Sequence, residues 1–435
     1  METGDSVTGG TRHARINGDR LWADIMTLGQ ITERDRPYTR RSFSSTFAEG
    51  RAWLADRYRA AGLAVRVDAG GNLIGRCPGL RPESPVIMVG SHSDSVPNGG
   101  RFDGIAGVLV ALEIARVLAE TQTALDHALE VIDFLAEEPS EYGLSCIGSR
   151  AMAGALDDAQ LAFMGPGQET IAAAIERVGG TPSRLIEARR NDLRAFLELH
   201  IEQGPVLEAR GLDVGIVTAI AGITRVEISL VGEAAHAGTS PMAGRRDAGV
   251  AAAEVVLAVR DLARALSGRG EGHFVATTGV VEIRPNAANV VPGEARLVID
   301  ARSEKAGLMQ EFLEGLRQRA AAIAQASGTS LSRFAILSHN DPAACDAGLQ
   351  QILAQSAAAM NCSATSIASG AGHDAAFVAR IAPAAMLFVP SRGGRSHCPE
   401  EWTEPSQLAA GAAVMLEAVR RIDRGAASVE RTGRG

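Results

Sequence analysis

The residues of this sequence that could carry chemistry lie in short polar segments, each directly after an apolar run. In GSHSDSVPNGGRFDG, at 90–104, His92 and Asp94 are two residues apart, so they point to the same side of an extended chain. Asp94 could therefore hold the His92 imidazole in one tautomer, as carboxylates do behind metal-bound histidines. Asp103 stands directly before an apolar helix, where it is either a ligand or the N-cap of that helix.

Three further segments have the same character. Glu137 and Glu138 end the run VIDFLAEE, and two adjacent buried carboxylates both stay ionised only beside cations. His200 lies in LELHIEQG at the end of a predicted strand, and His397 lies in GGRSHCPEE after a strand and a glycine turn. Three histidines with Asp and Glu, all in loops at strand ends, are typical of the ligand set of a hydrolytic divalent metal site.

The elements that must position these residues predict an α/β fold. Short apolar runs alternate with helical patterns, which indicates a sheet covered by helices on both faces. The runs are VIMVGS at 86–91, LEVIDFLAEE at 129–138, AFLELHIE at 195–202 and AMLFVP at 385–390, with helices at 104–120 and 404–422.

The pattern changes near Gly211. RVEISLVG at 225–232 alternates with period two, as a half-exposed strand should. Two helices and two further strands follow, which together make an α+β sandwich. We therefore expect a larger catalytic α/β domain, 16–210 with 328–425, an inserted smaller α+β domain at 211–327, and flexible tails at 1–15 and 426–435.

Composition narrows the classes of protein and partner. The 435 residues are 46% hydrophobic and 22% charged, the balance of a globular protein of more than one domain. A formal charge of −8 argues against nucleic-acid and membrane partners, because both need clustered positive charge. The five cysteines are scattered without a C-x-x-C pair, and the N-terminus is polar. We therefore expect a cytoplasmic protein with reduced thiols.

Taken together, the motifs resemble the di-metal amidase family that contains N-carbamoyl-L-amino-acid hydrolases, β-ureidopropionases and allantoate amidohydrolases, which are relatives of co-catalytic zinc exopeptidases. The likeness covers nearly all of the chain in order. It runs from INGDRLW at 16–22 through VDAGGNLIGR, GSHSDSVPNGGRFDGIAGVLVALE, FLAEE, ELHIEQGPVLE, HAGTSPMAGRRDA, NAANVVPG and SGAGHDAA to SRGGRSHCPEEWT.

The resemblance implies two divalent ions per subunit, with zinc expected and manganese, cobalt or nickel as alternatives. Asp103 would bridge the ions, His92 and His200 would bind one, and Glu138 and His397 would bind the other. Glu137 would be the general base that takes a proton from the attacking water. On a straight strand Glu137 and Glu138 point in opposite directions, so the backbone must bend there.

The resemblance also implies a homodimer whose inserted domain forms the interface and closes over the metal site. His236 would stabilise the oxyanion from the neighbouring subunit. Arg225, Asn289 and Arg302 would bind the carboxylate or ureido end of the substrate. By residue type alone, the two arginines are better interpreted as exposed strand residues, and the asparagine as a turn residue. Two more residues, Gln203 and His373, are expected to make polar contacts with the substrate.

The expected function is hydrolysis of a linear C–N bond in an N-carbamoyl-L-amino acid or related ureido acid, a small molecule with a carboxylate. Allantoate or a ureidopropionate is the next candidate substrate, followed by a dipeptide. Rival interpretations are an amidase with Cys146 or Cys398 as nucleophile, and a non-catalytic module, which would have lost Glu137 or ligands. Two segments depart from the family pattern and bear on substrate choice, namely EEPSEYG, where relatives read EEGSRF, and RPYTRRSFS, which lacks a glycine-rich lead.

Overall fold

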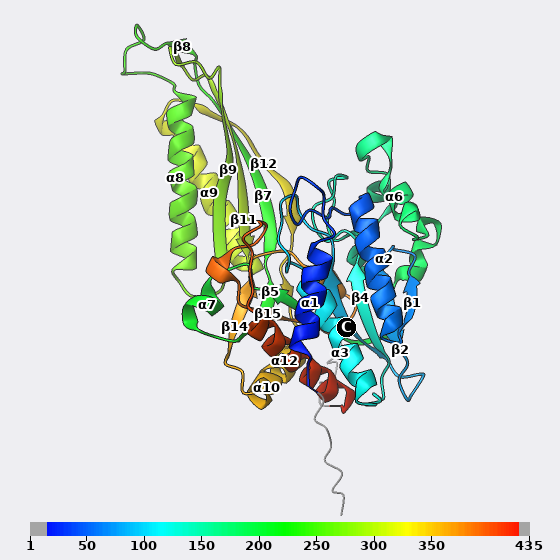
Figure 1. Cartoon of the computed structure of the whole chain (residues 1–435). Coiled ribbons are helices and arrows are strands. Elements are labelled where there is room, and N and C mark those ends of the chain that lie inside the picture. The colour runs from blue at the N-terminus through cyan, green and yellow to red at the C-terminus, as the bar shows by residue number, and fades with distance from the viewer. Residues whose placement is uncertain (1–14, 426–435) are drawn as a thin grey trace, which may run out of the picture. The chain divides into compact units, whose positions relative to one another are not determined.

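The computed structural model describes residues 15–425, which form two compact units (Figure 1). The larger unit takes its described residues from Met1–Thr218, Cys345–Ile367 and His373–Gly435. The smaller unit consists of Ala219–Ala344 and Ala368–Gly372, drawn mostly in green and yellow.

The larger unit contains most of a mixed sheet, which has nine strands within the described residues, in the order β1-β2-β4-β3-β5-β15-β6-β13 with β14 paired to β6. Only β13 and the last two residues of β6 and of β14 are assigned to the smaller unit. Its neighbours β4, β3, β5 and β15 run parallel and are buried almost throughout, as expected of strands covered on both faces. The strands are β1 Ala64–Val67, β2 Leu73–Cys77, β3 Val86–His92, β4 Leu129–Phe134, β5 Leu193–Ile201, β6 Val214–Ile220, β13 Ala343–Ala344, β14 Ala364–Ser369 and β15 Ala384–Val389.

Helices cover this sheet. The longest apolar one, α3, is buried on nearly every side because IAGVLVALEIARVL has no polar face, and it packs on β3 and against α1 and α12. No described helix has the length and apolar content needed to cross a membrane. The helices are α1 Gly18–Gly29, α2 Ser45–Ala60, α3 Ile105–Glu120, α4 Ile147–Ala153, α5 Asp158–Leu161, α6 Ile171–Arg177, α7 Val206–Arg210, α10 Ala347–Ala359, α11 Ala375–Val378 and α12 Pro405–Asp423.

The smaller unit is an antiparallel sheet in the order β12-β7-β11-β9, with two long helices packed on it. Side chains of β7 and β11 alternate between buried and more exposed, so one face forms a core with α8 and α9. The elements are β7 Gly222–Val231, β9 Phe274–Arg284, β11 Glu294–Ser303, β12 Ser330–Asn340, α8 Ala248–Ser267 and α9 Ala306–Ala326, with the short pair β8 Ala235–His236 and β10 Val290–Val291.

The predicted fold class, an α/β domain with a separate small α+β unit, is confirmed. The expected limits of the inserted segment, 211–327, differ from the observed division at both ends. The larger unit continues through Thr218, and β12 at the far end pairs with β7 in the small sheet. As an edge strand, β12 adds only partly buried side chains to the core, so its sequence lacks a clear alternation. The expected tails lie outside the described residues, apart from Arg15.

Candidate metal centre

The candidate ligands gather where four parallel strands of the larger sheet end. The carboxyl ends of β4, β3, β5 and β15 meet at one edge, which is where α/β folds carry reactive residues. The ligands implied by the resemblance all lie at this edge, namely His92 at the end of β3, Asp103 in the loop that follows, Glu138 after β4, His200 near the end of β5 and His397 after β15.

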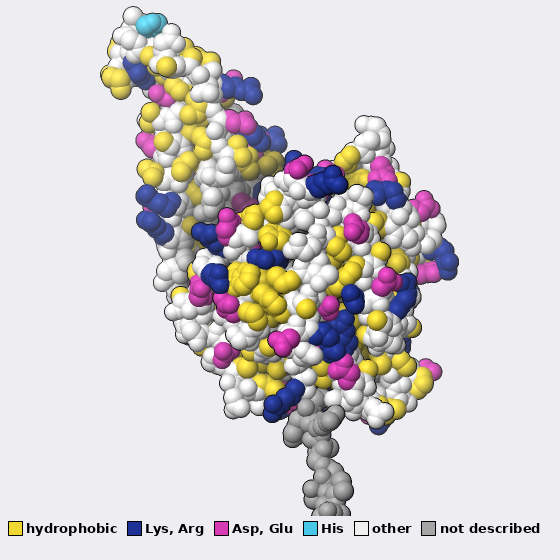
Figure 2. Space-filling model, in the orientation of Figure 1, with side chains coloured by type: hydrophobic (Ala, Val, Ile, Leu, Met, Phe, Trp, Pro, Cys, Tyr) yellow, Lys and Arg dark blue, Asp and Glu magenta, His cyan; other side chains and the backbone are white. Residues whose placement is uncertain are grey.

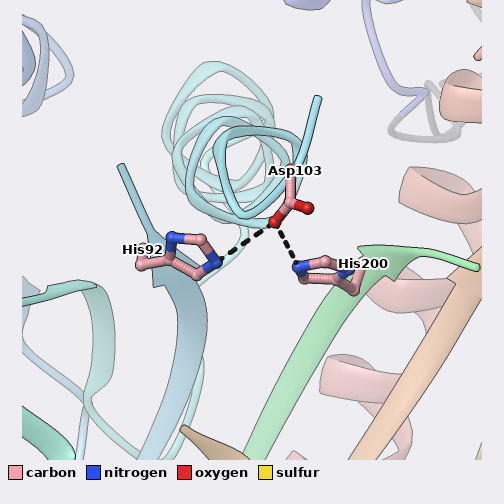
Figure 3. A group of neighbouring side chains, drawn as sticks. All are labelled: His92, Asp103 and His200. Atoms are coloured by element: carbon pink, nitrogen blue, oxygen red, sulfur yellow. Dashed lines mark ion pairs between the residues drawn. The ribbon is translucent and has the colours of Figure 1, made fainter. Parts of the chain in front are cut away.

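The first group joins two imidazoles to one carboxylate oxygen. His92 Nε2 and His200 Nε2 lie 3.5 and 3.2 Å from Asp103 Oδ1, with the rings pointing at it from neighbouring strands (Figure 3). The Nδ1 atoms lie 3.1 Å from the Asp94 carbonyl and 2.9 Å from the Ile201 carbonyl. A carbonyl oxygen can only accept, so each Nδ1 carries a proton, and Nε2 of the neutral ring is the nitrogen that offers a lone pair to a cation. His92 Nε2 is buried and has no hydrogen-bond partner among the described residues, as expected of a group that awaits a cation.

The second group lies on the other side of the same carboxylate. His397 Nε2 is 3.2 Å from both Asp103 Oδ2 and Glu138 Oε1. Hydrogen bonds to these two carboxylates raise the pKa of His397 to about 11, so this point of the site favours a positive charge. The His397 side chain is 48% exposed, whereas the other four candidate ligands are buried.

Asp103 is the residue common to both groups, and in each group the possible ligand atoms lie within 4.8 Å of one another. Burial alone would raise the pKa of Asp103, but the adjacent histidines hold it well below the usual range, so the carboxylate stays ionised. Its side chain does not cap α3, whose N-cap is Gly104. Histidine nitrogens and carboxylate oxygens suit zinc and similar divalent ions. The residues therefore fit two divalent ions that share Asp103.

The bend expected between Glu137 and Glu138 comes from the backbone that precedes them. Ala136 has a φ of 53°, which turns the chain after β4. The N–H groups of Glu137 and Glu138 then donate to Asp94 Oδ1 and Oδ2, at 3.3 and 3.2 Å. Both glutamates reach the site as a result, with Glu137 Oε2 3.5 Å from His92 Nε2.

The Glu137 carboxyl is buried, with His92 and several other carboxyl groups nearby. Burial raises its pKa well above the usual range, and the nearby Glu138, Asp374 and Asp94 raise it further. A buried carboxyl that binds a proton readily, close to possible metal ligands, has the properties of a general acid–base group.

Gln203 and His373 both lie at the centre, in contact with candidate ligands. Gln203 Nε2 donates to Asp103 Oδ2 at 2.7 Å and to Ser396 Oγ at 3.2 Å, so it supports the shared carboxylate. His373 is buried, and its ring centroid lies 4.5 Å from that of His200. The structure thus brings together every candidate residue of the larger unit.

The remaining candidates lie in the smaller unit and form two neighbourhoods of their own. In the first, exposed His236 on β8 accepts hydrogen bonds at Nδ1 from the N–H groups of Gly238 and Thr239, at 3.1 and 3.2 Å. The proton of a neutral ring is therefore on Nε2, which is left as a donor. The N–H of Ala237, the residue after His236, donates to the carbonyl of Asn289. The candidates His236 and Asn289 therefore lie side by side.

In the second neighbourhood, Arg225 and Arg302 share one carboxylate. Asp300 on β11 is the register partner of Arg225 on β7, and its Oδ2 lies 3.3 Å from Arg225 Nε. Its Oδ1 accepts a 2.9 Å hydrogen bond from Arg302 Nε, while Arg302 Nη1 donates to the Gly370 carbonyl at 2.9 Å. These partners fix the guanidinium of Arg302 through Nε and Nη1.

The two segments that depart from the family pattern contact each other. Arg41 Nη1 lies 2.5 Å from Glu141 Oε1, and the rings of Phe43 and Tyr142 pack edge to face with centroids 5.3 Å apart. Both departures therefore belong to one local structure, and one of them, residues 139–143, directly follows Glu138 in the chain.

Sequence reasoning missed three residues of these neighbourhoods, namely Ser396, Glu401 and Asp300. Ser396 Oγ donates to Asp103 Oδ2 at 2.8 Å, and Glu401 accepts hydrogen bonds from the N–H groups of Phe102 and Asp103. A signal for Glu401 existed, because it lies four residues after His397 in the same motif. Asp300, two residues before Arg302 on a strand, shares a face with it.

Comparison with known proteins finds relatives that match most of the chain. Residues 88–421 match the model of peptidase family M20/M25/M40. The chain is similar to the N-carbamoyl-L-amino-acid amidohydrolase of Paenarthrobacter aurescens, at 37% identity over 415 residues that cover 94% of this chain and 99% of the relative. It is also similar to the ureidoglycolate hydrolase of Arabidopsis thaliana, at 36% identity over 409 residues that cover 92% of this chain and 85% of the relative.

Among solved structures, an amidase of the hydantoinase/carbamoylase family from Burkholderia multivorans matches with a TM-score of 0.85 at 33% identity, and the match covers 93% of this chain and 97% of that one. The family resemblance seen in the motifs is confirmed. The chain therefore belongs to peptidase family M20/M25/M40, in its hydantoinase/carbamoylase amidase branch, and is a hydrolase of linear amide C–N bonds.

Proposed function

We propose that this amidohydrolase is a homodimer with two divalent ions per subunit, and that it hydrolyses an N-carbamoyl-L-amino acid to ammonia, carbon dioxide and the free amino acid. The observation that carries the proposal is the position of Glu137, 3.5 Å from His92 and next to both groups of candidate ligands. A base in this place has access to a water in the metal site. Zinc is the proposed native ion, and manganese, cobalt and nickel are compatible with the same donors.

Divalent ions bound to the two groups would acidify a water and polarise the substrate carbonyl. Glu137 takes the proton of the attacking water and passes it to the leaving nitrogen, a double role that suits a carboxyl whose pKa is raised by burial. Gln203 and Asp94 hold the Asp103 carboxylate and the Glu137 backbone in place during this transfer. Their contacts are made before substrate arrives, so the site needs little reorganisation.

The smaller unit supplies the groups that recognise the substrate. His236, with its proton on Nε2, donates to the oxyanion that forms at the attacked carbon in the neighbouring subunit's site. Arg302 binds the substrate carboxylate, and Asn289 binds the ureido end, since an amide offers both a donor and an acceptor.

A dimer is supported by the apolar surface of the smaller unit. Val280 and Val281 on the edge strand β9, and Ile336 and Leu337 on the edge strand β12, are exposed. Figure 2 shows hydrophobic side chains among the charged ones on this unit. Exposed apolar edge strands offer unpaired backbone groups and apolar surface to another chain.

An alternative substrate class has specific support, whereas an alternative nucleophile has specific evidence against it. The similarity to a ureidoglycolate hydrolase favours a ureido acid such as ureidoglycolate or allantoate as the second candidate substrate. Cys146 is disfavoured as a nucleophile, because burial raises its pKa well above that of a free thiol and so disfavours the reactive thiolate.

The test uses metal-free protein, reloaded separately with zinc, manganese, cobalt or nickel. Ammonia release is measured from N-carbamoyl amino acids, ureidopropionate, ureidoglycolate and allantoate, and free amine from dipeptides. We expect no activity without metal and the highest kcat/KM with an N-carbamoyl-L-amino acid. Full activity in protein shown by elemental analysis to be free of metal would overturn the mechanism, and a preference for another substrate would replace the proposed one.

A further inference from the structure

A buried carboxylate lies behind the shared ligand of the metal centre. Glu401 Oε1 accepts hydrogen bonds from the N–H groups of Phe102, at 2.8 Å, and Asp103, at 3.1 Å. Its Oε2 lies 2.9 Å from the Ser396 hydroxyl. The side chain is fully buried, so these contacts are not shared with bulk solvent. One side chain therefore ties the loop of Asp103 to the loop that carries His397.

The sequence leaves room for this carboxylate at Gly100. A Cβ atom at that position would overlap the carboxylate of Glu401. The backbone of the Asp103 loop therefore lies directly against Glu401, which any side chain at position 100 would prevent. Gly100 and Glu401 are 301 positions apart in the sequence, and Glu401 can take this position only because residue 100 has no side chain.

Ser396 connects Glu401 to the second group of ligands. Its hydroxyl lies 2.8 Å from Asp103 Oδ2 as well as 2.9 Å from Glu401 Oε2. It directly precedes His397, whose φ of 56° is unusual for a residue other than glycine and is maintained only where the surroundings fix it. Because His397 is also the exposed member of the ligand set, its position depends on how firmly Ser396 is anchored.

We infer that Glu401 is a positioning residue for the metal centre, which orients Asp103 between the two groups and anchors the His397 loop through Ser396. The inference rests on the ligand set of the proposed function. Its main effect falls on the ion held by Asp103, Glu138 and His397. Loss of such supporting contacts typically weakens metal affinity by about 10–100-fold.

The experiment measures binding of zinc alone, by calorimetric titration of metal-free protein, with no substrate present. We expect two ions per wild-type subunit, and in Glu401→Ala a dissociation constant about 10–100-fold higher for one of them. Glu401→Gln keeps an oxygen for the two N–H groups and an NH₂ for the serine oxygen, so it should recover most of the affinity. The adjacent exposed residue gives a matched control, and Glu400→Gln should bind zinc like wild type.

Two further variants keep the inference testable if Glu401→Ala does not fold. Ser396→Ala removes the hydroxyl that contacts Glu401, Asp103 and Gln203, and it should weaken the ion held by Asp103, Glu138 and His397 more than the other ion. Gly100→Ala should mimic the loss of Glu401, and added to Glu401→Ala it should cause little further loss, because the overlap is gone.

The outcomes separate the two hypotheses. Wild-type protein that binds no zinc would contradict the proposed function. Wild-type protein that binds two ions, with unchanged affinities in folded Glu401→Ala or Ser396→Ala, would contradict only the role of Glu401.

Discussion

The backbone N–H of Glu138 donates a 3.2 Å hydrogen bond to the carboxylate of Asp94, a residue of the preceding strand-end loop. The neighbouring N–H of Glu137 donates to the other oxygen of the same carboxylate. A single aspartate thus holds the turn that presents both a candidate base and a candidate ligand. The same residue contacts His92 through its backbone carbonyl. Asp94 therefore positions three residues of the metal centre, namely His92, Glu137 and Glu138.

The first prediction concerns this aspartate. Asp94→Asn places an NH₂ group against one of the two backbone N–H donors, so the turn loses a hydrogen bond. We expect metal affinity to fall by about 10–100-fold, with a loss of kcat that added metal only partly restores. Metal content and kcat are measured together, with the exposed Asp35→Asn as control. An Asp94→Asn enzyme with normal metal content and turnover would show that the turn holds without the charge.

The second prediction separates the two adjacent glutamates. Glu137→Gln keeps the shape of the side chain but removes the base, so kcat should drop by about 10²–10⁴-fold while both ions stay bound. Glu138→Gln should lose one ion, because a carboxylate ligand is replaced by a weaker donor. Elemental analysis and turnover are measured for both variants. Loss of metal in Glu137→Gln and retained metal in Glu138→Gln would mean that Glu138 is the base and Glu137 the ligand.

The third prediction concerns the tautomer and location of His236. Since two backbone N–H groups occupy Nδ1, only Nε2 can donate, and His236→Ala should lose about 10²–10³-fold in kcat without losing metal. His339→Ala, a partly exposed histidine of the same unit, should stay active.

Mixing subunits tests whether His236 acts across a dimer. A heterodimer of His236→Ala and Glu137→Gln contains one site with both groups intact, so mixed protein should recover part of the activity. No recovery after verified subunit exchange would mean that the histidine acts within its own subunit or not at all.

The fourth prediction concerns the arginine held by Asp300. If Arg302 binds the substrate carboxylate, wild type should strongly prefer an N-carbamoyl amino acid to its amide, by at least ~2 kcal/mol. Arg302→Ala should lose this preference, and Arg302→Lys should not restore it, because an ammonium lacks the planar fork. Asp300→Asn should raise KM for the acid more than it lowers kcat. Arg296→Ala, on the same strand, is the control, and equal turnover of acid and amide by wild type would refute the assignment.

The arrangement of the metal centre could be predicted from sequence because its ligands follow buried strands. His92 and His200 end apolar runs, and parallel strands bring such ends to one edge. The means by which Glu137 and Glu138 face the same site could not be predicted. The bend comes from a positive φ at Ala136, a residue type that carries no signal for that conformation.

Other features escaped prediction because they depend on long-range contacts. Glu401 contacts Phe102 and Asp103, which lie almost 300 positions earlier, so its place in the His397 motif hinted at a role but could not reveal these partners. The edge strand β12 contributes little to the core, so its pattern did not separate it from the flanking α/β region.

The ion pair between Arg41 and Glu141 has a consequence for engineering by loop exchange. Since Phe43 and Tyr142 also pack together, residues 36–44 and 139–143 form one exchangeable module rather than two. A transplant of 139–143 from a relative that has arginine at position 141 would set two guanidinium groups against each other. Chimeras with relatives should therefore carry both segments from the same parent.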